Sequence, residues 1–252
     1  MDNTVKFTGK AENYTKFRPS YPKEYLDYLV NECSIRKTSV VADVGAGTGI
    51  FTKSLLEKDC TVIAVEPNVD MRNAAQEFLN GYDKLTLVNG TDENTTILSH
   101  SVDLITAAQA FHWFDAEKFK LECRRILKPN AKVALVWNSR DSHSEFVMET
   151  SGICHRLCPN FHGFSGGDSS CSEEIFALFF KESKYDYKQF SNNLEYDLDG
   201  FIGRNLSASY APKENDKNYE EFIFEMKQHF QKYSNNGKVI VPNKTNSYIG
   251  EV

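Results

Sequence analysis

Residues 41–51 read VADVGAGTGIF, a run of strand-forming residues followed by glycines at positions 45, 47 and 49. The apolar, periodic residues that come next predict a helix. A strand, a glycine-rich turn and a helix form the first unit of the doubly wound folds that bind nucleotides. The stretch therefore predicts an α/β fold with a ligand site at this turn.

The residues around the glycines distinguish three classes of ligand. A phosphate loop requires Lys and then Ser or Thr after its last glycine, whereas Ile50 and Phe51 stand there. The dinucleotide fingerprint requires a small residue in place of Ile50. Asp43 would repel a phosphate about 5 Å away by about 3 kcal/mol at an effective dielectric constant of about 20, and would attract a cation equally. The turn therefore favours positive charge near Gly45, and S-adenosylmethionine carries a sulfonium and an ammonium group.

Glu66 ends the second expected strand, where doubly wound folds place an acid that binds ribose hydroxyls. NAD and S-adenosylmethionine both contain ribose, so this residue does not separate them. The strand, Asp43, the turn, the helix and Glu66 together predict a nucleoside site.

Short apolar runs alternate with helix-patterned segments over residues 40–136, which is typical of a parallel sheet with crossover helices. We expect strands at 40–44, 61–66, 85–89, 102–107 and 132–137. Asn68 and Asp115 are placed to cap two of the helices. Pro129 and Asn130 are placed to end the second one.

We expect a single domain over residues 1–252. Residues 1–36 would form a helical segment that closes the cofactor site, and 37–137 the cofactor-binding core. Residues 138–199, rich in Ser, Gly, Cys and aromatic side chains, would form a substrate cap or lid. Residues 200–252 would supply a C-terminal helix and closing strands, with an irregular tail.

The amino-acid composition limits the classes of partner that the chain is expected to bind. The 252 residues are 40% hydrophobic, which is enough apolar content to bury a core. The chain carries a net charge of −6. The chain has no long basic run, which argues against nucleic acid as a partner. No stretch resembles a signal peptide or the roughly 18 apolar residues of a membrane span. We expect a cytoplasmic monomer or homodimer that acts on a small molecule and does not bind a membrane.

A cluster of potential zinc ligands follows the core: Cys154, His155, Cys158, His162 and Cys171. Structural zinc sites usually show two compact ligand pairs, and the second pair is missing. We therefore expect no metal, and thiols in the reduced form.

Five segments together resemble the successive motifs of class I S-adenosylmethionine-dependent methyltransferases: VVADVGAGTGIFTKSLLE, VIAVEPNVDM, LVNGTDENT, VDLITAAQAFHWFD and RRILKPNAKVALVW. Within that class the chain resembles the type 11 small-molecule group, which includes trans-aconitate methyltransferase-like proteins. The resemblance is strong over about residues 10–140. It implies a Rossmann-like, seven-stranded, mostly parallel sheet with its last strand antiparallel, and S-adenosylmethionine across the carboxyl ends of the strands.

The resemblance also implies cofactor contacts. The turn residues Gly45, Ala46 and Gly47 would approach the methionine part of the cofactor, and Glu66 would bind both ribose hydroxyls.

The adenine contacts come from two further segments. Pro67 and Met71 would border the ring, and Thr91 and Asp92 match a pair that reads the adenine edge, although the family more often has Asp then Ala there.

Two more segments complete the implied contacts. Ala108 and Gln109 follow the fourth strand, where backbone carbonyl groups receive the cofactor's ammonium. In YTKFRPSYP, Arg18 would pair with the cofactor carboxylate or an anionic substrate, and Tyr14 would wall the pocket. The alternative is a solvated Arg and packed tyrosines.

Methyl transfer is an in-line displacement, so the protein mainly aligns the acceptor and excludes water. A carboxylate acceptor needs only a cation to orient it, whereas a hydroxyl or amine benefits from a base. His112 follows the fourth strand near the expected methyl position, so it is the candidate catalytic residue. Alternatively, it is a fixed donor in the pocket wall.

Aromatic residues would line the acceptor pocket: Phe111, Trp113, Trp137 and Tyr210. Aromatic residues at this density also form ordinary core. Arg140, just past the fifth strand, would hold a substrate carboxylate or remain a surface charge.

The expected function is methyl transfer from S-adenosylmethionine to a carboxylate or hydroxyl oxygen of a small molecule. One alternative is a methyltransferase for a nitrogen of nucleic acid or protein, although AAQAFHWF replaces the Asn/Asp-Pro-Pro-aromatic motif common there. A second is a protein that binds S-adenosylmethionine without catalysis. A third, a nicotinamide-dependent oxidoreductase, is disfavoured by Asp43 and Ile50.

Overall fold

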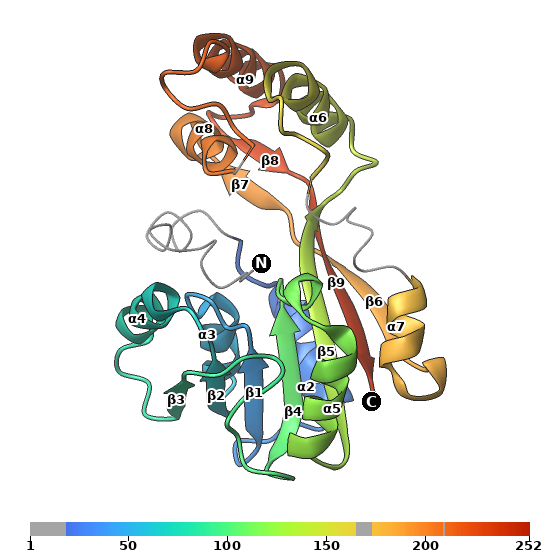
Figure 1. The fold of residues 1–252 in the computed structure, drawn as a ribbon. Coiled ribbons are helices and arrows are strands. Elements are labelled where there is room, and N and C mark those ends of the chain that lie inside the picture. The colour runs from blue at the N-terminus through green and yellow to red at the C-terminus, as the bar shows by residue number, and fades with distance from the viewer. Residues whose placement is uncertain (1–18, 165–172, 209) are drawn as a thin grey trace.

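The computed structural model describes residues 19–164, 173–208 and 210–252 (Figure 1). A seven-stranded sheet has the strand order β3-β2-β1-β4-β5-β9-β6. Its strands are β1 (Val40–Val44), β2 (Thr61–Val65), β3 (Leu85–Val88), β4 (Val102–Ala108), β5 (Leu127–Arg140), β6 (Asp186–Ser191) and β9 (Asn243–Gly250). Strands β1 to β5 pair in parallel, and β9 is antiparallel to both neighbours. The expected sheet, with its last strand antiparallel, is confirmed.

Helices cover both faces of this sheet. On one face, α2 (Lys23–Glu32), α3 (Ile50–Leu56) and α4 (Val69–Phe78) surround a core that contains Val41. On the other face, α5 (Ala116–Ile126) and α7 (Glu173–Phe179) cover a core that contains Ala42. Successive side chains of a strand point to opposite faces, so a strand covered on both sides is apolar throughout. This is why β1 was readable from the sequence.

The predicted signals at the helix N-termini act as expected. The Asn68 side chain accepts a hydrogen bond from the backbone N–H of Met71 at 3.0 Å, and the Asp115 side chain accepts one from that of Lys118 at 3.2 Å. Both predicted caps are confirmed.

The second of these helices, α5, however, ends at Ile126, and Pro129 and Asn130, which were expected to end it, lie within β5. Asn130 has a left-handed φ of 63°, which asparagine tolerates.

Beyond the sheet, a second group of elements forms a separate apolar cluster, which we call the cap. It contains α6 (Glu145–Leu157), β7 (Leu194–Tyr196), α8 (Leu198–Leu206), α9 (Tyr219–Tyr233) and β8 (Val239–Val241). Strands β7 and β8 pair in a small antiparallel sheet. Figure 1 shows the cap beyond one end of the main sheet, with β5 leading toward it and β9 returning from it.

The packing divides the chain differently from the expected segments 138–199 and 200–252. Within the first segment, β6 pairs with β9 in the main sheet, and α7 packs into the main core through Phe176 and Phe179. Within the second, α8, α9 and β8 belong to the cap. The cap is therefore built from two stretches of chain, because the apolar faces of α6 and α9 cover each other.

The expected irregular tail is instead strand β9, which pairs with β5 from Asn243 to Gly250. Its buried positions include Asn243, Thr245 and Ser247. Polar residues at these positions remove the apolar alternation that identifies a half-buried strand. The strand could not be recognised from hydrophobic periodicity for that reason.

Candidate functional site

A cleft opens where β1, β2 and β4 end. Its empty space, including the open mouth, is about 1070 Å³. It brings together most of the residues expected to bind the cofactor: Asp43, Gly45, Ala46, Gly47, Glu66, Pro67, Met71, Asp92, Ala108 and Gln109. Thr91 does not line it, and Tyr14 and Arg18 lie outside the described residues.

Other residues of the cleft wall were missed: Pro19, Tyr21, Thr48, Ile50, Phe51, Ala110, Phe114 and Asn138. Thr48, Ile50 and Phe51 could have been found, because they lie in the quoted turn and the start of its helix. Asn138 carried no local signal. Its side chain donates to the carbonyl oxygen of Ser20 at 3.2 Å and accepts from the Thr245 hydroxyl at 2.6 Å, so it joins segments far apart in the sequence.

The glycine turn is packed tightly against the wall of the cleft. Gly45 has φ of +72°, and a Cβ there would lie 2.6 Å from Ala110 Cβ. The backbone N–H groups of Gly45 and Ala46 donate to the carbonyl oxygen of Val65 at 2.9 and 3.1 Å. Only glycine therefore fits at position 45, and the turn is held against the end of β2.

Asp43 lies on the floor of the cleft and is 1% exposed. Its carboxylate accepts hydrogen bonds from the hydroxyls of Thr52 at 2.6 Å and Thr106 at 2.8 Å. Burial raises the pKa of Asp43 to about 6, although these hydrogen bonds lower it. At neutral pH the carboxylate is thus mostly charged, and it is fixed in place.

Glu66 follows β2 at the side of the cleft and is also buried. One carboxylate oxygen accepts from the backbone N–H of Gly47 and the other from that of Asn68, both at 2.9 Å. Burial raises the pKa of Glu66. An ionised carboxylate has about four acceptor positions, so each oxygen retains capacity for a hydroxyl donor.

Asp92 supplies a third carboxylate to the cleft wall. Burial raises its pKa, and a hydrogen bond from the backbone N–H of Asp115 lowers it. No Lys or Arg is present among the described residues that line the cleft. This arrangement favours a ligand with positive charge and disfavours a phosphate.

Two features of the cleft fit S-adenosylmethionine. The Thr48 hydroxyl is buried in the wall and has no hydrogen-bond partner within the described parts of the chain, so it is available to a polar group of a ligand. Gln109 has a left-handed φ of 56°, a conformation that costs about 1–3 kcal/mol and clusters at ligand sites. Its side chain donates to the carbonyl oxygen of Asn138 at 2.7 Å, which holds the turn after β4.

His112 lies beside the cleft but does not line it. The indole N–H of Trp137 lies 3.3 Å from His112 Nδ1. Because an indole nitrogen only donates, Nδ1 of the neutral ring accepts. In this tautomer the ring proton of His112 is on Nε2.

The aromatic residues expected to line the acceptor pocket do not lie together. Trp113 is 40% exposed and lines the cleft. Phe111 and Trp137 are buried in the main core, and Phe111 contacts Phe179 with ring centroids 4.9 Å apart. Tyr210 packs in the cap, with its ring centroid 4.7 Å from that of Phe161. Only Trp113 borders the cleft, because the others fill the apolar cores on either side of it.

Arg140 lies at the end of β5, toward the cap. Its guanidinium stacks 3.8 Å from the centre of the Phe164 ring, and Nη2 donates to Asn205 Oδ1 at 3.3 Å. Its Nη1 is buried and has no hydrogen-bond partner in the described ranges. Asn138 and Arg140 are two residues apart on the strand and share one face. Arg140 does not line the cleft that Asn138 borders, and instead lines a separate pocket with Thr150 and Asn205 of the cap.

The cysteines and histidines of the cap do not form a metal site in the part of the chain that the structure describes. Cys154 and Cys158 are buried and free, and Cys171 is not among the described residues. Separately, none of the described helices has the length and apolar character needed to cross a membrane.

Sequence comparison shows that the central segment of the chain is similar to methyltransferases. Residues 42–135 match the sequence profile of the methyltransferase domain family Methyltransf_11. An uncharacterized methyltransferase of Mycobacterium tuberculosis is 35% identical over 155 residues, which cover 62% of this chain and 61% of that protein. A second, from Schizosaccharomyces pombe, is 30% identical over 174 residues, or 69% and 65% of the two chains. The chain therefore spans about three fifths to two thirds of the length of these curated relatives.

Solved structures share the fold. A protein named as a type II methyltransferase, from Anaeromyxobacter dehalogenans, aligns with a TM-score of 0.70 and 21% identity, covering 93% of this chain and 98% of that one. Phosphoethanolamine N-methyltransferase 2 of Haemonchus contortus, solved with phosphomonomethylethanolamine and S-adenosylhomocysteine, aligns with a TM-score of 0.54 and 15% identity over 99% and 58% of the two chains. Residues 42–135 thus resemble a methyltransferase domain in sequence, and the chain shares its fold with solved methyltransferases.

Proposed function

We propose that the chain, through the methyltransferase domain at residues 42–135, transfers a methyl group from S-adenosylmethionine to a small-molecule acceptor bound between the cleft and the cap. The observation that carries this proposal is the charge of the cleft. Asp43, Glu66 and Asp92 line it without a lysine or arginine among its described residues. That charge suits a ligand with sulfonium and ammonium groups and disfavours the pyrophosphate of NAD.

The glycine turn after β1 and the end of β2 hold the methionine and ribose parts of S-adenosylmethionine. Gly45, Ala46 and Gly47 allow close approach of the backbone to the ligand. Glu66 accepts hydrogen bonds from the ribose hydroxyls, since its orientation is set by two backbone N–H groups.

The adenine lies between Pro67 and Met71 on one side and Asp92 on the other, where the Asp92 carboxylate accepts from the exocyclic amino group. The turn at Ala108 and Gln109 supplies carbonyl oxygens for the ammonium. Tyr14 and Arg18 precede the described residues and keep their proposed contacts with the cofactor or the acceptor.

The cofactor supplies an activated methyl group, so the residues of the chain align the acceptor and exclude water. Trp113 and Phe114, two of the four aromatic residues of the described cleft wall, exclude water from the site of transfer. His112 orients the acceptor oxygen from beside the cleft, where its ring contacts the Trp137 indole. A donor at this position suits an oxygen that is already ionised.

Of the two expected acceptors, a carboxylate or a hydroxyl oxygen, the proposed one is therefore the carboxylate. Arg140 holds a second anionic group of the acceptor from the cap side. The unpartnered Nη1 of Arg140 supports this role, since a buried guanidinium gains from a carboxylate in that position. A hydroxyl acceptor fits less well, because it would need a base, whereas a carboxylate needs none.

Two measurements test the proposal. Calorimetric titration should show binding of S-adenosylhomocysteine and none of NADH. Purified protein should then release S-adenosylhomocysteine from S-adenosylmethionine with at least one member of a panel of di- and tricarboxylates. Release with phenols, amines or nucleic acid but with no carboxylate would contradict the acceptor class, and no release with any acceptor would favour a non-catalytic binding protein.

A further inference from the structure

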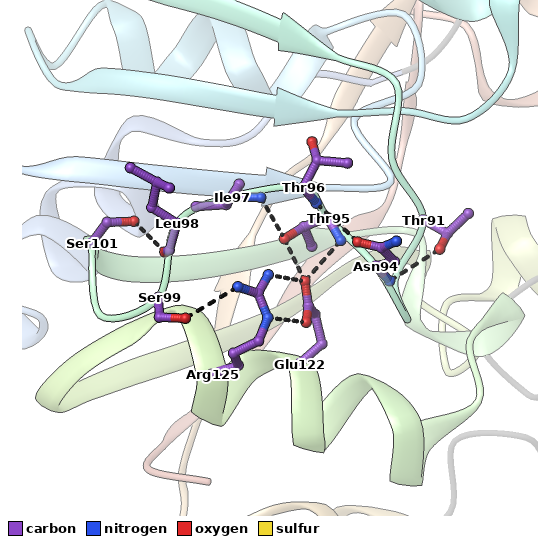
Figure 2. Close-up of polar contacts among 10 residues, drawn as sticks. All are labelled: Thr91, Asn94, Thr95, Thr96, Ile97, Leu98, Ser99, Ser101, Glu122 and Arg125. Carbon is purple, nitrogen blue, oxygen red and sulfur yellow. Dashed lines mark hydrogen bonds and ion pairs between the residues drawn. The ribbon is translucent and has the colours of Figure 1, made fainter.

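The connection between β3 and β4 contains no helix and lies along α5 (Figure 2). It spans residues 89–101 and carries Asp92 into the cleft wall. The position of Asp92 therefore depends on what holds this connection against α5.

Glu122 on α5 makes the central contact. It is 6% exposed, and its Oε1 accepts from the backbone N–H of Thr95 at 2.8 Å and from the Thr95 hydroxyl at 2.6 Å. Arg125 donates to both carboxylate oxygens, each at 2.7 Å. Burial raises the pKa of Glu122, but these hydrogen bonds lower it below its usual value. The carboxylate is thus charged and held from two sides, as Figure 2 shows.

Contacts continue along the same face of α5. Lys118 donates to Glu93 Oε1 at 2.9 Å, and Arg125 Nη1 donates to the Ser99 hydroxyl at 3.4 Å. Residues 118, 122 and 125 recur at helical spacing. The connection follows the helix in the same order, so α5 serves as its template.

The backbone of the connection is closely packed between Asp92 and Thr95. A Cβ on Gly90 would lie 2.8 Å from the carbonyl oxygen of Thr95. The backbone N–H of Thr91 donates to the carbonyl oxygen of Asn94 at 2.9 Å, and that of Asn94 donates to the Thr91 hydroxyl at 3.1 Å. Displacement of Thr95 would therefore move the turn that carries Asp92.

We propose that Glu122 is a positioning residue for nucleobase recognition, because it fixes Thr95 and through it the carboxylate of Asp92 at the cofactor cleft. This inference rests on the proposed contact of Asp92 with the adenine amino group. Hypoxanthine has an oxygen in place of that amino group, which the Asp92 carboxylate would repel. Correct placement of Asp92 thus makes the cleft prefer an adenosyl over an inosyl ligand.

The test compares the dissociation constants of S-adenosylhomocysteine and S-inosylhomocysteine by calorimetry. We expect the wild-type preference for the adenosyl ligand to fall at least fivefold in Glu122→Gln and in Asp92→Asn. The double variant should show no further fall beyond Asp92→Asn, because Glu122 acts through Asp92. Glu117→Gln, at an exposed position of the same helix, is the matched control and should keep the preference.

A purely structural Glu122 would lower the melting temperature of Glu122→Gln and leave the preference intact, which would overturn the inference. An unchanged preference in Asp92→Asn would overturn it as well. Failure of the wild type to bind S-adenosylhomocysteine would instead contradict the proposed function. If Glu122→Gln does not fold, Thr95→Val provides a second variant. It removes the hydroxyl, one of the two groups of Thr95 that donate to Glu122, and should lower the preference for the adenosyl ligand in the same direction.

Discussion

The carboxylate of Glu66 accepts a hydrogen bond from the backbone N–H of Gly47 at 2.9 Å, which joins the end of β2 to the glycine turn after β1. This hydrogen bond therefore connects two predicted binding elements directly. A ribose placed against Glu66 would lie directly over the turn.

Replacement of Glu66 by Gln should weaken binding of S-adenosylhomocysteine by about 10- to 100-fold, since hydrogen bonds to a charged group contribute about 1.5–3 kcal/mol. Calorimetric titration measures the change. Glu77→Gln, at an exposed position of α4, is the control. Equal affinity in Glu66→Gln and the wild type would exclude a ribose contact.

Replacement of Gly45 by Ala should destabilise the fold more than replacement of Gly237. Both residues have positive φ, but a Cβ would meet Ala110 at 2.6 Å only at position 45, while position 237 is open. The left-handed conformation costs about 1–2 kcal/mol in each variant, and overpacking adds about 1–3 kcal/mol at position 45. Urea denaturation measures both, and equal losses would argue against tight packing of the turn.

Asp43 should make stability depend on pH. Burial raises its pKa from 3.8 to about 6, so the folded protein binds a proton more tightly than the unfolded chain. The free energy of unfolding should therefore fall as pH rises from about 4 to about 6, by up to about 3 kcal/mol from this group.

Asp43→Asn cannot titrate at this position, so its unfolding free energy should vary less over the same pH range. Burial raises the pKa of Glu66 and of Asp92 in both proteins. The difference between the two curves therefore reports Asp43 together with its electrostatic coupling to Glu66. Parallel curves from urea denaturation at a series of pH values would contradict the raised pKa.

Replacement of His112 by Ala should lower kcat for the acceptor by about 10- to 100-fold, the contribution of one hydrogen bond to a charged oxygen, and leave the affinity for S-adenosylhomocysteine nearly unchanged. Trp137→Phe removes the donor that fixes the His112 tautomer, so it should lower kcat in the same direction by a smaller factor. Wild-type turnover in His112→Ala would reject a catalytic role.

Replacement of Arg140 by Met should raise KM for a carboxylate acceptor by about 10- to 100-fold, because a charge-assisted hydrogen bond is lost. Cofactor affinity should not change, since Arg140 does not line the cofactor cleft. Arg156→Met is the control, because Arg156 is exposed on α6 and pairs with Glu225. Steady-state kinetics with equal KM in the two variants would show that Arg140 does not contact the acceptor.

The core of the fold could be predicted because its strands are buried on both faces. Strand β1 begins and ends at the expected residues, Val40 and Val44, and the expected starts of β2, β3 and β4 also agree. Strand β5 begins five residues earlier than expected, at Leu127, because Leu127 already pairs with Val102. Periodicity could not show that pairing.

Some residues of the candidate site could likewise be predicted from the sequence, and others could not. Asp43, Gly45 and Glu66 could be located from the sequence, because they stand at fixed positions relative to strands that apolar runs make visible. Asn138 could not, since its role comes from contacts with Ser20 and Thr245. Trp137 was expected in the acceptor pocket but is buried in the core, because its indole fills the apolar space beside Phe176.

The sequence by itself determined the doubly wound sheet and the glycine turn, because each depends on residues close together in the chain. Only the tertiary structure decided the composition of the cap, the tautomer of His112 and the contacts of the connection that carries Asp92. These depend on side chains from distant segments, such as Glu122 and Thr95, which meet only after the sheet has formed.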